Sequence, residues 1–210
     1  MNTFVIAIFT CIISTIFVLS VAYSMSRMRF KMRKPFMNIA MIIGLFPSFM
    51  SMIAVYYILR ALNLADGAMI RVALIIVFSA GSGAGFYVAK GFFDTISKSL
   101  DEAAIIDGAT RWNVFTKITV PLSKPIIVYT ILTSFMGPWV DFIFGKVICR
   151  ADAQYYTVSI GLWKMLEKEY IDSWYTCFAA GAVVVSIPIA ILFLMTQKFY
   201  VEGMTGAVKG

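Results

Sequence analysis

Five apolar segments with very few charged residues are the feature that most restricts how this chain folds. Each is long enough to cross ~30 Å of hydrocarbon as a helix, which takes about 20 residues. Backbone groups in lipid have no water to bond, so single segments of this kind form helices. Apart from residues at their edges, they contain one charged side chain, that of Asp141. We therefore predict an all-α polytopic membrane protein, a single transmembrane domain over residues 1–210, with five spans at 4–26, 35–59, 70–90, 125–146 and 177–198.

The composition excludes several classes of protein. Hydrophobic residues make up 60% of the chain and charged residues only 14%, against about a quarter in soluble domains. There is no histidine, and the three cysteines are too few and too scattered for a metal site. The spans also lack a carboxylate pair or a Ser–Lys dyad. We expect a non-catalytic protein without cofactor or metal, whose net charge of +7 reflects membrane orientation rather than nucleic-acid binding.

The distribution of basic residues predicts the orientation in the membrane. Five of them lie between Arg27 and Lys34, directly after the first span, with no acid among them. Lys and Arg accumulate on the cytoplasmic side of membrane proteins. Placing this run inside puts twelve of the eighteen Lys and Arg residues in the cytoplasm, and the reverse orientation inverts that bias. The N-terminus and the loop at 146–176 are then outside, and the loop at 91–124 and the C-terminus are inside.

The polar loop at 91–124 is the longest interruption between the spans. Ser99 and Glu102 have the spacing of a capping box, which predicts that a helix begins with Ser99 as its N-cap. Gly108 is expected to end this helix, and a second short helix that carries Trp112 and Phe115 runs on to Pro121. These helices have apolar faces but too few residues to bury them alone. We expect the loop to dock on another protein or to lie on the membrane surface.

The fourth span contains a helix-breaking pair, Gly137-Pro138, which is expected to break or kink it. Phe135, Trp139 and Phe142 follow the i, i+4, i+7 spacing of one helical face. Two interpretations remain open, because this face either lines a translocation path or packs against the third and fifth spans.

The outer end of the predicted bundle holds two further features. Asp141 lies close to the outer end of the fourth span, where an acid is either functional or an end residue that reaches toward water. The loop at 146–176 is rich in Tyr and Trp. Aromatic residues are enriched both at protein interfaces and at membrane surfaces, so the loop either faces another protein or forms a lid that packs on the spans.

The polar loop carries a resemblance to a known family. Its pattern of Glu102-Ala103-Ala104, Gly108, Phe115, Ile118, Pro121-Leu122 and Pro125 resembles the EAA motif of ABC-importer permease subunits. The resemblance extends over nearly the whole chain to the carbohydrate branch of that family, through Asn2-Thr3, Pro47, Gly137-Pro138-Trp139, Pro188 and the ending Gly206-Ala207-Val208-Lys209-Gly210. Val140 departs from the pattern, because relatives usually have Asn there.

The resemblance implies a permease subunit of an ATP-driven, binding-protein-dependent oligosaccharide importer in the bacterial or archaeal cell (inner) membrane. Its partners would be a second, different permease subunit, two ATP-binding subunits that hydrolyse ATP, an extracellular or periplasmic sugar-binding protein, and membrane lipid, but no nucleic acid. The same architecture for another solute, an amino acid or a polyamine, is the alternative. Relatives typically have one more helix before Asn2-Thr3, so this chain begins at what would be their second span.

The resemblance also assigns roles to residues. It places coupling to the ATPase in the EAA loop, at Glu102, Ala103, Ala104, Asp107, Gly108, Ala109 and Phe115. The C-terminal tail is expected to be flexible and to reach the ATPase interface through Gly206, Lys209 and Gly210. In the family the outer loop faces the sugar-binding protein, and the candidates for the translocation path are Phe135, Trp139 and Phe142.

Overall fold

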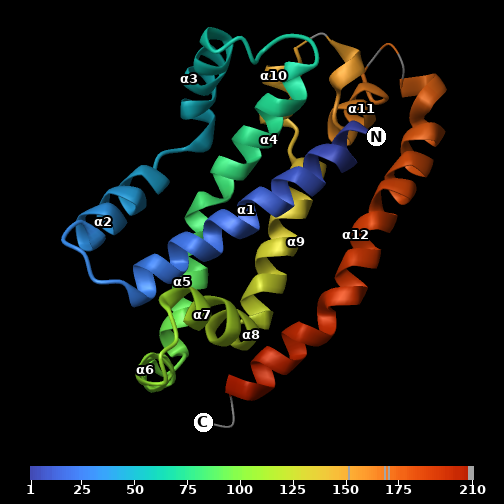
Figure 1. Cartoon of the computed structure of the whole chain (residues 1–210). Helices are drawn as coiled ribbons and strands as arrows, with labels where there is room; N and C mark the ends of the chain where they lie inside the picture. Colours follow the sequence, from blue (N-terminus) through green and yellow to red (C-terminus); the bar gives the residue numbers. More distant parts are fainter. Residues whose placement is uncertain (151, 168, 170, 208–210) are drawn as a thin grey trace.

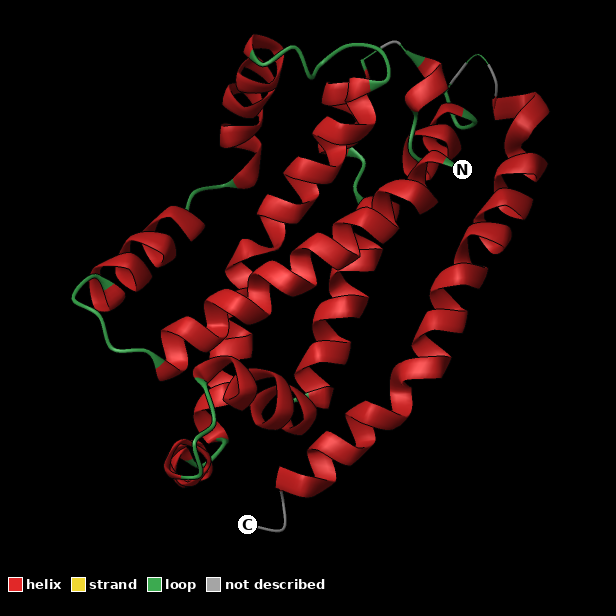
Figure 2. Cartoon of the chain, in the orientation of Figure 1, coloured by secondary structure: helices red, strands yellow, loops and turns green. Residues whose placement is uncertain are grey.

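The described chain is helical throughout, as predicted (Figure 2). The computed structural model describes the backbone of residues 1–150, 152–167, 169 and 171–207, and the side chains within these ranges except those at 48, 49, 82, 83, 198 and 200–207. In chain order its elements are α1 (Asn2–Arg27), α2 (Arg33–Gly44), α3 (Ser48–Ala61), α4 (Met69–Gly81), η1 (Ser82–Gly85), α5 (Phe86–Thr95), α6 (Lys98–Ile106), α7 (Arg111–Val114), η2 (Phe115–Thr119), α8 (Val120–Leu122), α9 (Lys124–Val140), α10 (Ile143–Cys149), η3 (Ala153–Tyr155), α11 (Val158–Lys164) and α12 (Ile171–Ala207).

Helix α1 lies at the centre of the fold and contacts α9, α5 and α4 (Figure 1). Its buried face repeats every four residues, which is the spacing of one helical stripe. That stripe consists of Ile6, Thr10, Ser14, Val18 and Ala22. Several of these side chains are small or carry hydroxyls, which lets neighbouring backbones approach closely, as in membrane helix pairs. The opposite face exposes large apolar residues and is available to lipid or another protein.

Two helices are long and apolar enough to cross a membrane, Asn2–Arg27 and the Ile171–Gln197 part of α12. Two bent pairs qualify when each is taken as one broken span: α4 with α5, bent by 42°, and Arg111–Leu122 with α9, bent by 82°. By length and composition, the described residues therefore hold two to four candidate spans.

The predicted second span is not one helix. It is divided into α2 and α3 at Leu45-Phe46-Pro47, so the expectation of a continuous helix over 35–59 is wrong. Proline lacks an amide hydrogen and disfavours helical conformation in the residue before it. None of the residues of α2 is buried, and Phe36, Ile39 and Ile43 are well exposed. This apolar surface fits lipid or a partner better than water.

The breaks in the later spans fall at other residues than predicted. The sequence predicts a break or a kink at Gly137-Pro138. Helix α9 runs through this pair and ends at Val140, so it is not broken there. Pro138 has no amide hydrogen to bond the carbonyl one turn before it, but the helix continues past it, and the amide of Asp141 donates to the carbonyl of Gly137 at 3.0 Å to close the helix. The segment 125–146 thus comprises α9 and the start of α10.

The C-terminal helix is longer than the predicted fifth span. It begins at Ile171 rather than at residue 177 and continues to Ala207. The tail is therefore helical as far as Ala207, and Gly206 lies in the helix. Lys209 and Gly210 lie outside the described residues.

Two hydrophobic clusters stabilise the two ends of the molecule. One joins the start of α1 to α3, α4, α10 and α11 through Ile6, Leu59, Ile70, Leu74, Ile148 and Ile160. The other joins the end of α1 to α5 and α9 through Val18, Tyr23, Phe86, Phe93 and Ile126. Figure 1 shows α6, α7, α8 and the end of α12 at this second end. We call residues 96–122 the coupling loop, after the role that the family resemblance implies for them.

Candidate functional site

Helix α6 in the coupling loop is bounded by two local signals. Its N-cap is Ser97, whose Oγ accepts a hydrogen bond from the amide of Ser99 at 3.3 Å, so the predicted cap at Ser99 is wrong by two positions. At the other end Gly108 has φ +86°, a left-handed conformation that favours glycine. The amides of Gly108 and Ala109 donate to the carbonyls of Ile105 and Ala104, which is the Schellman arrangement. The expectation that Gly108 ends the helix is confirmed.

The outer surface of α6 is apolar and unpartnered in the described chain. Ile106 is 85% exposed and Ile105 51% exposed, although isoleucine is usually buried. Glu102, Ala103 and Asp107 are exposed beside them. A short helix with this face is expected to dock on another protein or to lie on the membrane surface.

The inner surface of α6 is fixed by a buried ion pair that the sequence reading misses. Arg27, at the end of α1, lies 3.0 Å from Asp101 between Nε and Oδ2, and the two side chains are 5% and 12% exposed. The Nη2 group of Arg27 also donates to the carbonyl of Ile96 at 2.9 Å. Removing one partner of a buried pair leaves an uncompensated charge, at a cost of about 3–5 kcal/mol. The sequence signals of this pair are an acid next to the motif and a basic run about 70 residues earlier, and nothing in their spacing joins them.

The last turns of α1 hold the coupling loop at further points. The hydroxyl of Tyr23 donates to the carbonyl of Arg111 at 3.2 Å, and its ring lies 4.7 Å from that of Phe115 between centroids. Ser26 donates to Asp94 at 2.6 Å, just before the loop. Phe115 therefore packs against α1 instead of joining the exposed face of α6. The predicted second helix is confirmed in outline, but η2 within it is a π-helical turn.

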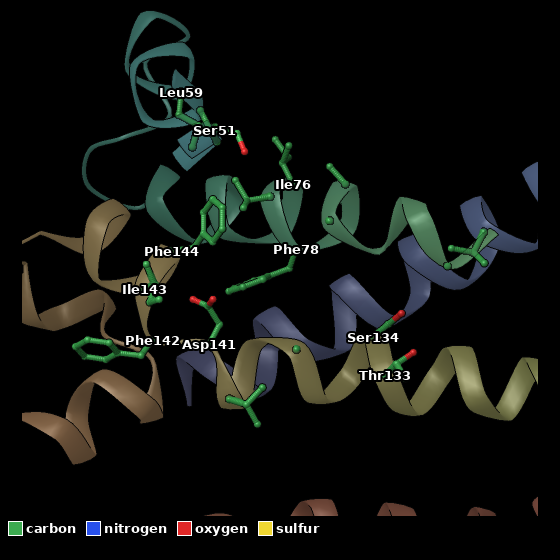
Figure 3. A pocket seen from close by; sticks show the side chains of 18 of the residues that line it. Ser51, Leu59, Ile76, Phe78, Thr133, Ser134, Asp141, Phe142, Ile143 and Phe144 are labelled. Carbon is green, nitrogen blue, oxygen red and sulfur yellow. The ribbon is translucent and has the colours of Figure 1, made fainter. Parts of the chain in front are cut away.

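A large cavity lies between α3, α4 and α9, and α1, η1 and α10 also contribute to its wall. Its volume is about 1140 Å³, and its lining is mostly apolar, with the hydroxyls of Thr133 and Ser134 among the exceptions. Figure 3 shows the carboxylate of Asp141 pointing into it, toward the ring of Phe78. The amide of Gly145 donates to Asp141 Oδ1 at 3.0 Å, which orients the carboxylate. An apolar cavity with a few convergent polar groups is typical of a small-molecule site.

The three predicted path residues are not brought together at this cavity. Phe142 lines it, with its ring 5.1 Å from that of Trp163. Phe135 and Trp139 are not among the lining residues, and their rings lie 5.9 Å apart, with Phe135 also edge-on to Phe4 at 6.3 Å. Because α9 ends at Val140, Phe142 does not continue the helical face of the other two. The cavity residues of α3 and α4 were not apparent from sequence spacing, because they come from separate helices.

The segment at 146–176 packs on the start of α1. The side-chain amide of Asn2 donates to the carbonyl of Gln154 at 2.7 Å, and the amide of Val158 donates to Thr3 Oγ1 at 2.8 Å. Lys146 lies 4.5 Å from the ring centroid of Trp163. Of the two interpretations, packing on the helices is the one this geometry shows.

The sequence matches known proteins over most of its length. The family of the binding-protein-dependent transport system inner membrane component matches residues 15–204. The galactooligosaccharides transport system permease protein GanQ of Bacillus subtilis (strain 168) is 36% identical over all of this chain and 73% of its own length. The maltodextrin permease protein MdxG of the same organism is 33% identical over all of this chain and 74% of its own length. The maltose/maltodextrin permease protein MalG of Escherichia coli (strain K12) is 33% identical over 90% of this chain and 64% of its own length. The chain therefore belongs to the family of binding-protein-dependent transport system inner membrane components.

Proposed function

We propose that this protein is a permease subunit of an ATP-driven importer of oligosaccharides. The similarity to permeases named for galactooligosaccharides, maltodextrin and maltose supports a sugar substrate. The non-catalytic role follows from the same relationship, with ATP hydrolysis on a partner subunit. The protein is a multi-pass component of the cell membrane and works with a second permease subunit, two ATP-binding subunits and a sugar-binding protein.

The observation that carries the coupling role is the geometry of α6. Its outer face presents Glu102, Ile105 and Ile106, while its inner face is joined to α1 through Arg27 and Asp101. A docked ATPase would press on the outer face, and the ion pair would pass that displacement to the central helix. Glu102, Ala103, Ala104, Asp107, Gly108 and Ala109 form the docking face and its turn, whereas Phe115 holds the loop to α1.

The membrane placement is part of the same proposal. Five spans would be formed by α1, by α2 with α3, by α4 with α5, by α9 with the start of α10, and by α12. The end with the coupling loop would face the cytoplasm, since the Arg27–Lys34 run lies there. The N-terminus and the segment at 146–176 would then be outside.

The translocation path would run along the large cavity between α3, α4 and α9. Its volume of about 1140 Å³ is ample for part of an oligosaccharide, and its apolar wall suits the carbon faces of sugar rings. Asp141 and the hydroxyls of Thr133 and Ser134 supply acceptors and donors for sugar hydroxyls. Phe142 shares this wall, and Phe135 and Trp139 would face the path only where a second permease subunit completes it.

The test is uptake by the complete transporter reconstituted in proteoliposomes with its binding protein. Labelled maltodextrin and galactooligosaccharide are compared with labelled amino acids and polyamines, with ATP inside. ATP-dependent accumulation of an oligosaccharide is expected, and Asp141→Asn should lower it while leaving assembly intact. Accumulation of an amino acid or polyamine without any sugar would overturn the proposal.

A further inference from the structure

A second cavity, of about 520 Å³, lies at the end of α1 beside the coupling loop. Its wall combines the linker between α1 and α2 with α6 and the start of α7. The basic side chains that line it come from all of these segments, namely Arg27, Arg29, Arg33, Lys98 and Arg111. Asp101 and Glu102 are the acids among its lining residues, so five positive charges face two negative ones.

Most of these basic side chains have no direct ion pair within the described chain, although Arg33 lies close enough to Asp94 to help lower the pKa of that carboxyl. Arg27 is paired with Asp101, but Arg29, Arg33, Lys98 and Arg111 form no direct ion pair with a described acid. Like charges gathered around one hollow repel each other, and an anion between them removes that repulsion. Guanidinium groups match the geometry of phosphate oxygens, to which they bind in a bidentate manner.

The surroundings of this basic cavity indicate where the anion comes from. The linker that lines the cavity lies between two apolar helices, α1 before it and α2 after it. The linker itself exposes Phe30 and Met32, and α2 exposes Phe36 and Ile39. Apolar surface next to a cluster of Lys and Arg is typical of a segment that lies at the headgroup layer of a membrane.

We propose that the basic cavity binds the phosphate of an anionic phospholipid. Arg29, Arg33 and Arg111 would hold the phosphate oxygens, and Lys98 would add charge at the entrance. The inference rests on the proposed membrane placement of α1, and it does not depend on which solute is carried. Because Glu102 and Ile105 of α6 also line the cavity, a bound lipid would touch the helix that is proposed to dock the ATPase.

Native mass spectrometry of the complete transporter, in equal amounts of phosphatidylglycerol and phosphatidylcholine, tests the proposal. The wild-type complex is expected to retain phosphatidylglycerol in preference to phosphatidylcholine. The triple variant Arg29→Gln, Arg33→Gln, Arg111→Gln should lose that preference by about tenfold or more, since each basic residue near a membrane surface contributes substantially to anionic-lipid binding. The triple Arg→Lys variant, which keeps the charge, should retain part of it.

A matched variant removes the same charge outside the cavity. Lys31→Gln, Lys34→Gln, Lys117→Gln changes three exposed lysines at the same end of the molecule and should keep the preference. Equal loss of the lipid preference in both triple variants would show that the lipid is attracted by the overall positive charge of this end and not by the cavity, and it would overturn the proposal. So would displacement of the lipid by inorganic phosphate alone, or lipid retention only after the ATPase subunits are removed. A wild-type complex that imports no sugar would contradict the proposed function and leave this binding result standing.

Discussion

At the scale of single residues, Gly108 has the most demanding backbone. A Cβ at this position would meet no atom within 4 Å, so space does not exclude a side chain. The restriction is its φ of +86°, which costs a residue with a side chain about 1–2 kcal/mol. The turn that sets the direction of α6 therefore depends on backbone conformation and not on packing.

We predict that Gly108→Asp weakens docking of the ATPase without affecting membrane insertion. The strain would disrupt the hydrogen bonds from Gly108 and Ala109 that end α6, and it would add a charge beside the docking face. Recovery of the ATPase in co-purification should fall severalfold. Gly108→Asn is the matched control, because Asn tolerates this conformation better and adds no charge. Wild-type recovery and transport by the Gly108→Asp variant would contradict the prediction.

The pair of Arg27 and Asp101 gives a second prediction. Asp101→Ala should destabilise the complex by about 3–5 kcal/mol, because it leaves the guanidinium buried without a counter-charge. Replacing both residues by apolar ones, Arg27→Met with Asp101→Leu, should restore much of the stability but not the coupling of ATP hydrolysis to uptake. Unfolding of the purified complex and ATP hydrolysed per sugar imported are the measurements. If the effects of Arg27→Met and of Asp101→Leu on the free energy of unfolding simply add in the double variant, the two residues are not coupled.

The thiols differ in a way that can be checked by labelling. Burial, with a smaller effect of Asp152, raises the pKa of Cys149 to about 11. Only the thiolate reacts, so the folded protein should leave Cys149 unmodified by maleimide at pH 7. Its reactivity should increase only as the pH approaches that pKa. The same thiol should react at pH 7 once the protein is unfolded, which is the internal control. Cys177 is exposed in the fold, but it lies in the proposed fifth span, where lipid would shield it. Rapid labelling of Cys149 at pH 7 would contradict its burial.

At the scale of elements, the end of α12 extends the molecule toward the side of the coupling loop. The tail is helical as far as Ala207, so its direction follows that of α12. Deleting Thr205–Gly210 is expected to lower sugar-stimulated ATP hydrolysis more than assembly, because the tail would contact the ATPase only after docking. Stimulated hydrolysis and co-purification are measured on the same preparation. Unchanged stimulation would remove the proposed role of the tail.

At the scale of the whole molecule, α1 connects the two ends. Its first residues bind the segment at 146–176 through Asn2 and Thr3. Its last turns hold the coupling loop through Tyr23 and Arg27, and the end of α5 through Ser26. At 1.5 Å per residue, its 26 residues span about 39 Å. A displacement of α6 would therefore be transmitted along α1, which is one continuous helix, to the opposite end of the molecule.

We predict that the segment at 146–176 faces the sugar-binding protein even though it packs on α1. Ser159 is a poor position for a crosslinker, because its hydroxyl donates to the carbonyl of Asp141 within the fold. Ala153 is exposed, and Ala153→Cys in a background without Cys11, Cys149 and Cys177 should crosslink to the binding protein in a nucleotide-dependent manner. If no crosslink forms in any nucleotide state, the segment is a lid that packs on the spans and does not face the binding protein.

The sequence by itself determined the helical membrane class, the position of α1, the turn at Gly108 and the family. These follow from apolar run length, from the conformational freedom of glycine and from a local motif, all of which act over short stretches of chain. Only the tertiary structure decided that Pro47 divides a predicted span, whereas Pro138 lies within a helix that continues past it. It also decided that Arg27 pairs with Asp101 and that Asp141 points into a cavity formed by several helices. Such outcomes depend on which segments meet in space. The periodicity of each segment shows which of its faces is apolar but not which other segment packs against that face.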